Sequence, residues 1–291
     1  MAKDQSCHKL VSVDYLLCES RQQLKQANIA SYQIDPLILL QEICSLTKEQ
    51  IIFNKDLCIS NVLANKFLES IKLRKKSMPV AKIIGKKDFF DSSFIVSEDV
   101  LDPRPDSEIL IETVIDNFRD DLQKFTILEL GTGSGCLVLS LLKIYKNSQA
   151  VAVDISQKAL AIANKNANNL LISDQLTLVE SDLFDEITDK FDLIISNPPY
   201  IAAKEIEELS LDTKYDPEIA LNGGVDGLDF YRRIAQNANK YLNNNGKIIV
   251  EIGCNQENDV KDIFLQNNFV FQDERKDLAG IIRVLTFYAK N

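Results

Sequence analysis

Residues 197–200, Asn-Pro-Pro-Tyr, stop a short apolar run in a way that suits the binding of a planar amide or amino group. Pro198 and Pro199 each fix φ and lack a backbone donor, so they end a strand and hold their neighbours rigidly. The Asn197 Oδ1 atom and the Pro198 carbonyl could accept two N–H bonds, and the Tyr200 ring offers a face for stacking. The alternative interpretation of these four residues is a turn that only closes a core strand.

A glycine-rich stretch, Glu129 to Gly135, follows the first strand of an α/β pattern and opens a helix. Its sequence is Glu-Leu-Gly-Thr-Gly-Ser-Gly, and glycines there let the backbone turn tightly and approach a ligand closely. The dinucleotide fingerprint expects a further glycine at position 136, where this chain has Cys136, so a pyrophosphate site is less well matched. The glycine spacing alone does not identify the ligand.

Acidic residues follow the next two predicted strands. Asp154 ends a strand 19 positions after Gly135 (154 − 135), the distance at which an acid accepts hydrogen bonds from a ribose diol. Asp182 follows the third strand, where a carboxylate could take an adenine amino group and Leu183 or Phe184 could cover the ring. Each acid could instead cap a helix or form a turn. Because the carboxyl ends of parallel strands face one crevice, these residues together indicate a site for a nucleoside cofactor.

The elements that must position these residues alternate from residue 125 onward, which predicts an α/β fold with an open, mostly parallel sheet covered by helices on both faces. Strands are predicted at 125–130, 150–154, 176–179, 191–196, 248–252, 269–272 and 283–288. Helices are predicted at 136–145, 157–168, 228–242 and 257–265. The segment 243–246, Asn-Asn-Asn-Gly, is predicted to be a turn.

The N-terminal part has a different pattern. From residue 11 to 76 apolar residues recur at spacings of three and four, which predicts a small helical domain over residues 1–77, with one helix starting at Asp35-Pro36 and another over 61–73. Residues 78–98 are predicted to form a linker hairpin, with strands at 83–85 and 88–96, and residues 99–291 the α/β domain. Near the start of the α/β domain, Asp106 or Ser107 is predicted to cap a helix.

Composition excludes several kinds of site. The chain has 291 residues, 45% of them hydrophobic, and a formal net charge of −10, which argues against nonspecific attraction to nucleic acid. Six cysteines without a C-x-x-C pair and a single histidine, His8, suggest neither a metal site nor a disulfide framework. The basic run at 72–76 is interpreted as a solvated helix end. Without a leader or a long apolar run, the chain is expected to be cytoplasmic.

Taken together, these motifs resemble one family, the bacterial release-factor glutamine methyltransferases, which are class I S-adenosylmethionine methyltransferases. The resemblance spans residues 79 to 284 and is specific in sequence. Two departures are Asp102, where an apolar residue is usual, and Ser107, where threonine is usual. Both are expected to lie outside the methyl-transfer centre. The matching segments are 83–90, 101–108, 129–135, 154–160, 197–201, 220–228, 251–256 and 276–283.

The resemblance implies a Rossmann-like, seven-stranded methyltransferase sheet and S-adenosylmethionine as cofactor, with S-adenosylhomocysteine as product. Gly131, Thr132, Gly133, Ser134, Gly135 and Asp154 would hold its methionine and ribose parts, and Asp182 with Leu183 its adenine. Asn197, Pro198, Pro199 and Tyr200 would hold the substrate glutamine, with Asn197 also touching the cofactor. The substrate would be the Gly-Gly-Gln loop of a class I peptide-chain release factor. The acidic segment 201–227 would steer that loop, and the N-terminal helices would dock the partner.

Three other functions remain open at this point. A methyltransferase acting on the adenine amino group of DNA or RNA would use the same Asn-Pro-Pro-Tyr geometry on a flipped base, but the sequence offers no basic groove. A non-catalytic S-adenosylmethionine-binding protein would use the helical domain for interactions, which the intact Asn197 and Tyr200 argue against. A nicotinamide oxidoreductase is the least favoured alternative, because Cys136 stands where the dinucleotide fingerprint expects a glycine.

Overall fold

The computed structural model describes residues 10–54 and 56–290 and divides into two compact units, Met1–Gly85 and Lys86–Asn291. The two units divide at Gly85, which lies inside the predicted linker 78–98. The predicted domain boundaries at 77/78 and 98/99 stay predictions. Cys7 and His8 lie outside the described residues. Within the described part of the chain, every helix is too short or too polar to cross a bilayer.

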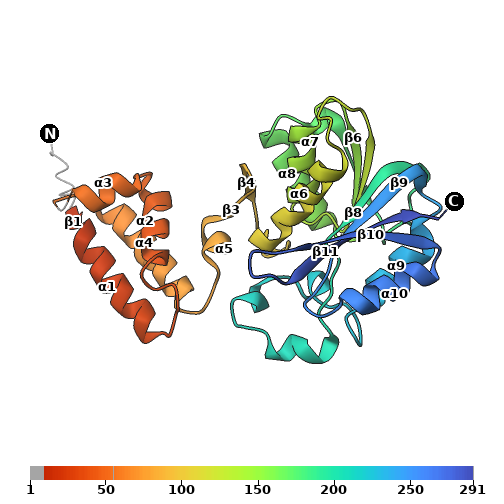
Figure 1. The fold of residues 1–291 in the computed structure, drawn as a ribbon. Coiled ribbons are helices and arrows are strands. Elements are labelled where there is room, and N and C mark those ends of the chain that lie inside the picture. Colours follow the sequence, from red (N-terminus) through yellow and green to blue (C-terminus); the bar gives the residue numbers. More distant parts are fainter. Residues whose placement is uncertain (1–9, 55, 291) are drawn as a thin grey trace. The chain divides into compact units, whose positions relative to one another are not determined.

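The first unit is helical (Figure 1). Its helices are α1 (Val13–Gln26), α2 (Asp35–Cys44), α3 (Lys48–Phe53), α4 (Asn61–Arg74) and α5 (Val80–Ile84). Helices α1, α3 and α4 begin after Ser12, Thr47 and Ser60, whose hydroxyls accept backbone N–H bonds of the first turn. Each of these cap residues has an extended backbone, so the helix starts at the residue that follows it. A core that includes Leu16, Leu39 and Phe67 holds the helices together.

Two predictions for this unit were wrong, and one strand pair was not predicted. Leu10–Ser12 (β1) and Cys58–Ser60 (β2) form a small antiparallel pair that helical periodicity cannot reveal. The predicted strand 83–85 is instead the end of α5, because Pro79 precedes that helix and Gly85 closes it with φ +76°. The basic run is not all solvated: the Arg74 Nε atom lies 2.6 Å from Asp35 Oδ2, and both side chains are buried.

The second unit is built on a seven-stranded sheet in the order β10-β11-β9-β8-β5-β6-β7, which confirms the predicted fold class. Strands β9, β8, β5, β6 and β7 run parallel, and β11 is antiparallel to both of its neighbours. The strands are β5 (Thr126–Leu130), β6 (Gln149–Asp154), β7 (Leu176–Glu180), β8 (Phe191–Ser196), β9 (Leu242–Glu251), β10 (Phe269–Lys276) and β11 (Ile282–Ala289).

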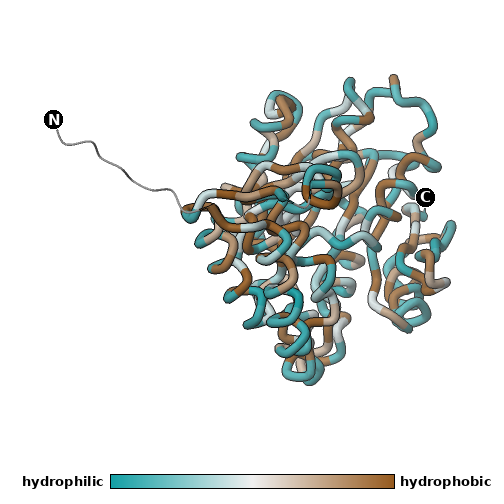
Figure 2. Tube along the Cα trace, turned by 90° about the vertical axis from the view of Figure 1, so that its left-hand side faces the viewer, coloured by the Kyte–Doolittle hydropathy of each residue, from teal (hydrophilic) through white to brown (hydrophobic). Residues whose placement is uncertain are grey.

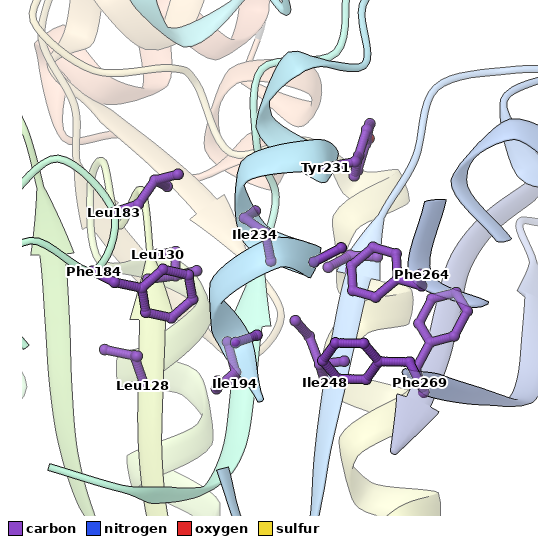
Figure 3. Close-up of a cluster of buried hydrophobic side chains, with 14 of the residues drawn as sticks. Leu128, Leu130, Leu183, Phe184, Ile194, Tyr231, Ile234, Ile248, Phe264 and Phe269 are labelled. Atoms are coloured by element: carbon purple, nitrogen blue, oxygen red, sulfur yellow. The ribbon is translucent and has the colours of Figure 1, made fainter. Parts of the chain in front are cut away.

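Helices cover both faces of this sheet (Figure 1). On one face Leu193 and Ile195 of β8 share a core with α6 (Glu108–Asn117), α7 (Cys136–Ile144) and α8 (Gln157–Asn169). On the other face Ile194 shares a core with α9 (Asp229–Ala238) and α10 (Glu257–Gln266). Figure 3 shows this second core, with Ile194 and Ile248 of neighbouring strands near Ile234 of α9. Successive strand residues thus face opposite cores, and the helices show hydrophobic and hydrophilic residues alternating along their turns (Figure 2).

One further segment differs from prediction, and the predicted hairpin is found. Residues 243–246 lie inside β9, where the partner of β8 jumps from Leu242 to Lys247, so they form a bulge rather than a turn between elements. The hairpin of β3 (Lys86–Phe89) and β4 (Ser92–Ile95) belongs to the second unit. The side chain of Asn166 on α8 accepts from the Ile95 N–H at 2.7 Å and donates to the Ile95 carbonyl at 3.0 Å. The hairpin is therefore bonded to the α/β fold.

Candidate active site

Two cavities lie at the carboxyl ends of the parallel strands, and three residues line both of them: Leu101, Asn197 and Ala220. The first, here the loop cavity, is also lined by Gly131, Gly133, Asp154, Asp182, Leu183 and Pro199. The second, here the Tyr200 cavity, is also lined by Arg104, Pro198, Tyr200, Glu251 and Arg283. The fold thus brings the predicted cofactor and substrate residues to adjoining spaces, with Asn197 at their boundary.

The glycine loop forms part of the loop cavity. Gly133 has φ +55°, and a Cβ built on it would meet nothing within 4 Å, so the backbone conformation is what requires glycine there. Gly135 begins α7 with φ +79°, and a Cβ on it would lie 3.0 Å from Leu139 Cδ1 and 3.3 Å from Ala163 Cβ. Gly135 therefore serves helix packing, whereas Gly133 faces the cavity.

Thr132 and Ser134 of the same loop are buried in the fold. The Thr132 hydroxyl donates to Glu129 Oε2, and the Ser134 carbonyl accepts from Asn166 Nδ2 at 2.8 Å. Burial raises the pKa of Glu129 to about 8, and the charge of Asp154 adds to the rise while the Thr132 bond opposes it. These contacts make Thr132 and Ser134 supports of the loop in this structure, which the glycine pattern did not reveal.

Asp154 lies where the sequence predicts, at the end of β6 and in the wall of the loop cavity. Its Oδ2 accepts from the Gly133 N–H and its Oδ1 from the Ser156 N–H, each at 2.9 Å. Burial raises the pKa of Asp154, and these backbone bonds oppose the rise. Asp154 therefore shapes the glycine loop as well as lining the cavity.

Asp182 and Leu183 line the loop cavity after β7. Leu183 adopts φ +55°, and the Ser181 hydroxyl donates to its carbonyl at 3.0 Å, so a tight turn presents its side chain to the cavity. Asp182 Oδ1 lies 2.9 Å from Nη2 of Arg233 on α9. No pattern in the sequence indicates this ion pair, because its partners lie on separate elements.

Asn197 follows the last residue of β8, and its Nδ2 donates to the Ser107 hydroxyl at 3.0 Å. This hydrogen bond assigns the amide orientation and leaves Oδ1 as the acceptor available to a ligand. Ser107 occupies the N-cap position of α6, as predicted, although its side chain makes no capping hydrogen bond. Its contact with Asn197 places it in the candidate site, whereas the sequence led us to expect it outside. The hydroxyl makes the contact, and serine retains the hydroxyl that threonine would offer.

Tyr200 lines the cavity named after it. Gln256 ties its backbone to the loop after β9, because Gln256 Nε2 donates to the Tyr200 carbonyl at 3.0 Å and Oε1 accepts from the Gly253 N–H at 2.9 Å. Burial raises the pKa of Tyr200 to about 12, and the charge of Glu251 contributes. The phenol is therefore neutral at physiological pH and offers an uncharged ring and a hydroxyl.

Several residues that line the Tyr200 cavity were not predicted from the sequence to be site residues. Arg104 pairs with Asp216 at 2.5 Å across 112 residues of chain, and Arg283 pairs with Asp277 at 2.9 Å. Glu251 is 2% exposed, and burial raises its pKa to about 7. One signal could have found Glu251: like Asp154, it is an acid at the end of an apolar strand that runs to the same sheet edge.

Solved structures share the fold of this chain. The hMettl16 catalytic domain, solved with a MAT2A 3'UTR hairpin, has a TM-score of 0.56 at 16% identity and covers 80% of this chain and 84% of its own. The T. thermophilus 16S rRNA N2 G1207 methyltransferase has a TM-score of 0.50 at 17% identity over 71% of this chain and 50% of its own. At these identities the likeness is one of fold alone.

Sequence comparisons are more specific. Residues 16–85 match the PrmC N-terminal domain, and residues 88–212 match the methyltransferase small domain. A bifunctional methyltransferase of Rickettsia felis is 37% identical over 95% of this chain, which spans 58% of that relative's length. Release factor glutamine methyltransferases are 38% identical in Clostridium acetobutylicum and 34% in Agrobacterium fabrum, where the matches cover 93% and 95% of those proteins. The chain therefore belongs to the family of release factor glutamine methyltransferases.

Proposed function

We propose that this protein transfers a methyl group from S-adenosylmethionine to the side-chain amide nitrogen, N5, of the glutamine in the Gly-Gly-Gln motif of a class I peptide-chain release factor. One observation carries the proposal: Asn197 lines both cavities, so an amide bound at Asn197 would adjoin a ligand in the loop cavity. Family membership supports the same reaction. Because release factors act on ribosomes, the reaction would take place in the cytoplasm.

The loop cavity fits the cofactor chemically. The open space beside Gly133 leaves room for a ligand against the backbone, and Asp154 offers a carboxylate for a ribose diol. Asp182 and Leu183 combine an acceptor for an adenine amino group with an apolar surface for its ring. When bound, S-adenosylmethionine supplies an electrophilic sulfonium methyl group. The transfer forms a carbon–nitrogen bond, breaks the carbon–sulfur bond of the sulfonium to leave S-adenosylhomocysteine, and releases one amide proton to solvent.

The residues of the Tyr200 cavity suit the activation of an amide. An amide nitrogen is a poor nucleophile because its lone pair is delocalised. Asn197 Oδ1 and the Pro198 carbonyl would accept its two N–H bonds and favour the more amine-like geometry of the transition state, while Pro199 keeps the segment rigid. The neutral Tyr200 ring would stack on the planar amide. Positioning and directed hydrogen bonds then supply the rate.

The partner would be recognised by charge and by the N-terminal helices. The segment 201–227 carries Glu205, Glu207, Glu208, Asp212 and Glu218, which would attract a basic, glycine-rich loop and repel a phosphate backbone. Asp216 of the same segment is buried and paired with Arg104, so its charge does not contribute. Glycines in that loop would let the glutamine extend into a narrow cavity. Residues 1–77 would dock the body of the release factor, and no direct contact with nucleic acid or membrane is part of the proposal.

Incubation of the protein with S-adenosylmethionine and a class I release factor tests the proposal. Tandem mass spectrometry should place one added methyl on the glutamine of the Gly-Gly-Gln motif, and a release factor with that glutamine changed to alanine should stay unmodified. Methyl label on DNA or RNA, with none on the release factor, would favour an adenine-amino methyltransferase. Cofactor binding without transfer to either would favour a non-catalytic binding protein.

A further inference from the structure

Glu251 is a buried carboxylate that the reaction described above does not use. It is the last residue of β9, is 2% exposed, and lines the Tyr200 cavity together with Asn197. Among the described residues, its Oε2 atom has no hydrogen-bond partner. A buried carboxylate with an unsatisfied oxygen destabilises a fold, so stability does not explain this residue.

The contacts of Glu251 lead to Asn197. The Ser107 hydroxyl accepts a hydrogen bond from Asn197 Nδ2, so its own single proton needs another acceptor. Burial raises the pKa of Glu251, and hydrogen-bond contacts of its carboxylate with the side chains of Ser107 and Asn197 lower it. Glu251 and Asn197 therefore flank one serine hydroxyl, and its proton can satisfy the carboxylate while its lone pair receives the amide.

We propose that Glu251 is a positioning residue for the methyl-accepting amide, which takes the Ser107 hydroxyl proton in a hydrogen bond and so holds Asn197 with Oδ1 available to the substrate. This inference rests on the proposed function for the identity of the substrate. Without an acceptor at residue 251, the Ser107 hydroxyl could turn its proton toward Asn197. The Asn197 amide would then lose its single orientation, and the flipped amide would present N–H groups to the substrate's own N–H bonds.

Ionisable groups from several elements interact with this carboxylate, so a pH experiment must separate their titration from that of Glu251. These groups are Arg283 of β11, Asp106 in the turn before α6, Tyr200 after β8, Tyr231 of α9 and Cys136 of α7. Burial raises the pKa of Glu251 to about 7, so its charge changes between pH 6 and 8. A variant at residue 251 itself separates its titration from that of the others.

The test compares Glu251→Leu with Glu251→Gln in the full-length protein. Leucine removes the acceptor, and methyl transfer to the release factor in single turnover should fall on the order of 10²-fold, as expected for a misplaced reacting group. Glutamine keeps an acceptor oxygen and should restore most of the rate. S-adenosylmethionine affinity should stay within about twofold in both. The melting temperature should not fall, because a buried unsatisfied carboxylate has been removed.

Thr286→Val provides the matched control. Thr286 of β11 is also buried with an unpartnered hydroxyl among the described residues, and it pairs with Ile249 of β9. Its replacement should leave methyl transfer unchanged. Equal rates in Glu251→Leu and wild type, or a rate loss that follows a lowered melting temperature, would overturn the inference.

A second measurement does not need the release factor. In ¹⁵N spectra the Asn197 side-chain signals, identified by their loss in Asn197→Ala, should shift with a midpoint near pH 7 in the wild type and stay constant in Glu251→Gln. Constant wild-type signals would overturn the inference even if methyl transfer is observed. A release factor left unmodified by the wild type would overturn the proposed function, while the Asn197 signals would still decide the link to Glu251.

Discussion

At the scale of single residues, Asp154 combines two tasks that the sequence analysis had treated as one. Its carboxylate is available to the loop cavity, and it also holds the Gly133 and Ser156 N–H groups. Charge-assisted bonds of this kind each contribute about 1.5–3 kcal/mol. A ligand bound here would therefore depend on Asp154 both directly and through the shape of the glycine loop.

Asp154→Ala should weaken S-adenosylmethionine binding by at least about 1.5–3 kcal/mol, because the ribose loses its acceptor. Calorimetry on the folded variant measures the change. Asp174→Ala, in the short 3₁₀ turn Ser173–Gln175 before β7, serves as a control that removes an acid elsewhere and should bind normally. Normal affinity in folded Asp154→Ala would mean that the ribose binds somewhere else.

Asn197→Ala should leave cofactor affinity largely intact and lower methyl transfer by roughly 10²–10³, the loss expected when one preorganised transition-state contact is removed. The physical reason is that Oδ1 is the acceptor left after Nδ2 is bonded to Ser107. Single-turnover kinetics at saturating cofactor measures the step. A full rate in this variant would exclude an orienting role for Asn197.

At the scale of elements, Asn166 of α8 links three parts of the second unit. Its buried amide bonds the Ile95 N–H and carbonyl in β4 and the Ser134 carbonyl in the glycine loop. The hairpin and the cofactor loop are thereby held by one side chain. A segment that the sequence presents as a linker therefore has a part in building the site.

Asn166→Ala should lower the free energy of unfolding by about 1–3 kcal/mol, because it leaves buried backbone groups without partners. It should also weaken S-adenosylmethionine binding, since the glycine loop loses a support. Denaturant unfolding and calorimetry measure the two effects. Asn168→Ala, on the exposed side of the same helix, should change neither quantity by a comparable amount. Cofactor affinity that survives the loss of stability would show that the loop is held without α8.

At the scale of the whole molecule, the two units have separate cores, and both cavities of the site are lined by residues of the second unit alone. The first unit exposes large apolar side chains, among them Phe53 at 82% and Val62 at 59%. This arrangement agrees with the proposal that methyl transfer takes place in the second unit and that the first unit docks the partner.

A chain beginning at Ser77 should bind S-adenosylmethionine as the full-length protein does but methylate the release factor with a raised KM, because it lacks the docking helices. Steady-state kinetics on the whole release factor and on a short Gly-Gly-Gln peptide separates the two effects, since the peptide should be modified equally by both proteins. Equal KM values on the whole release factor would contradict the docking role.

Local signals in the amino-acid sequence were enough to predict some parts of this protein. Alternating strands and helices predicted the open, mostly parallel sheet, and two prolines predicted where β8 stops. Gly131, Gly133, Asp154 and Asp182 were predicted to share one crevice, and they line the loop cavity. These predictions succeeded because backbone sterics and hydrophobic periodicity act within a few residues. The tertiary structure alone decided which distant side chains meet. Ser107 and Asn197 are 90 residues apart in the chain, and Arg104 and Asp216 are 112 apart. Helix-capping and turn propensities are the same for such residues whatever their distant neighbours are, so only the packing of the sheet edge assigns Ser107 and Arg104 to the site. Glu251 differs, because its place at the end of an apolar strand is a local signal.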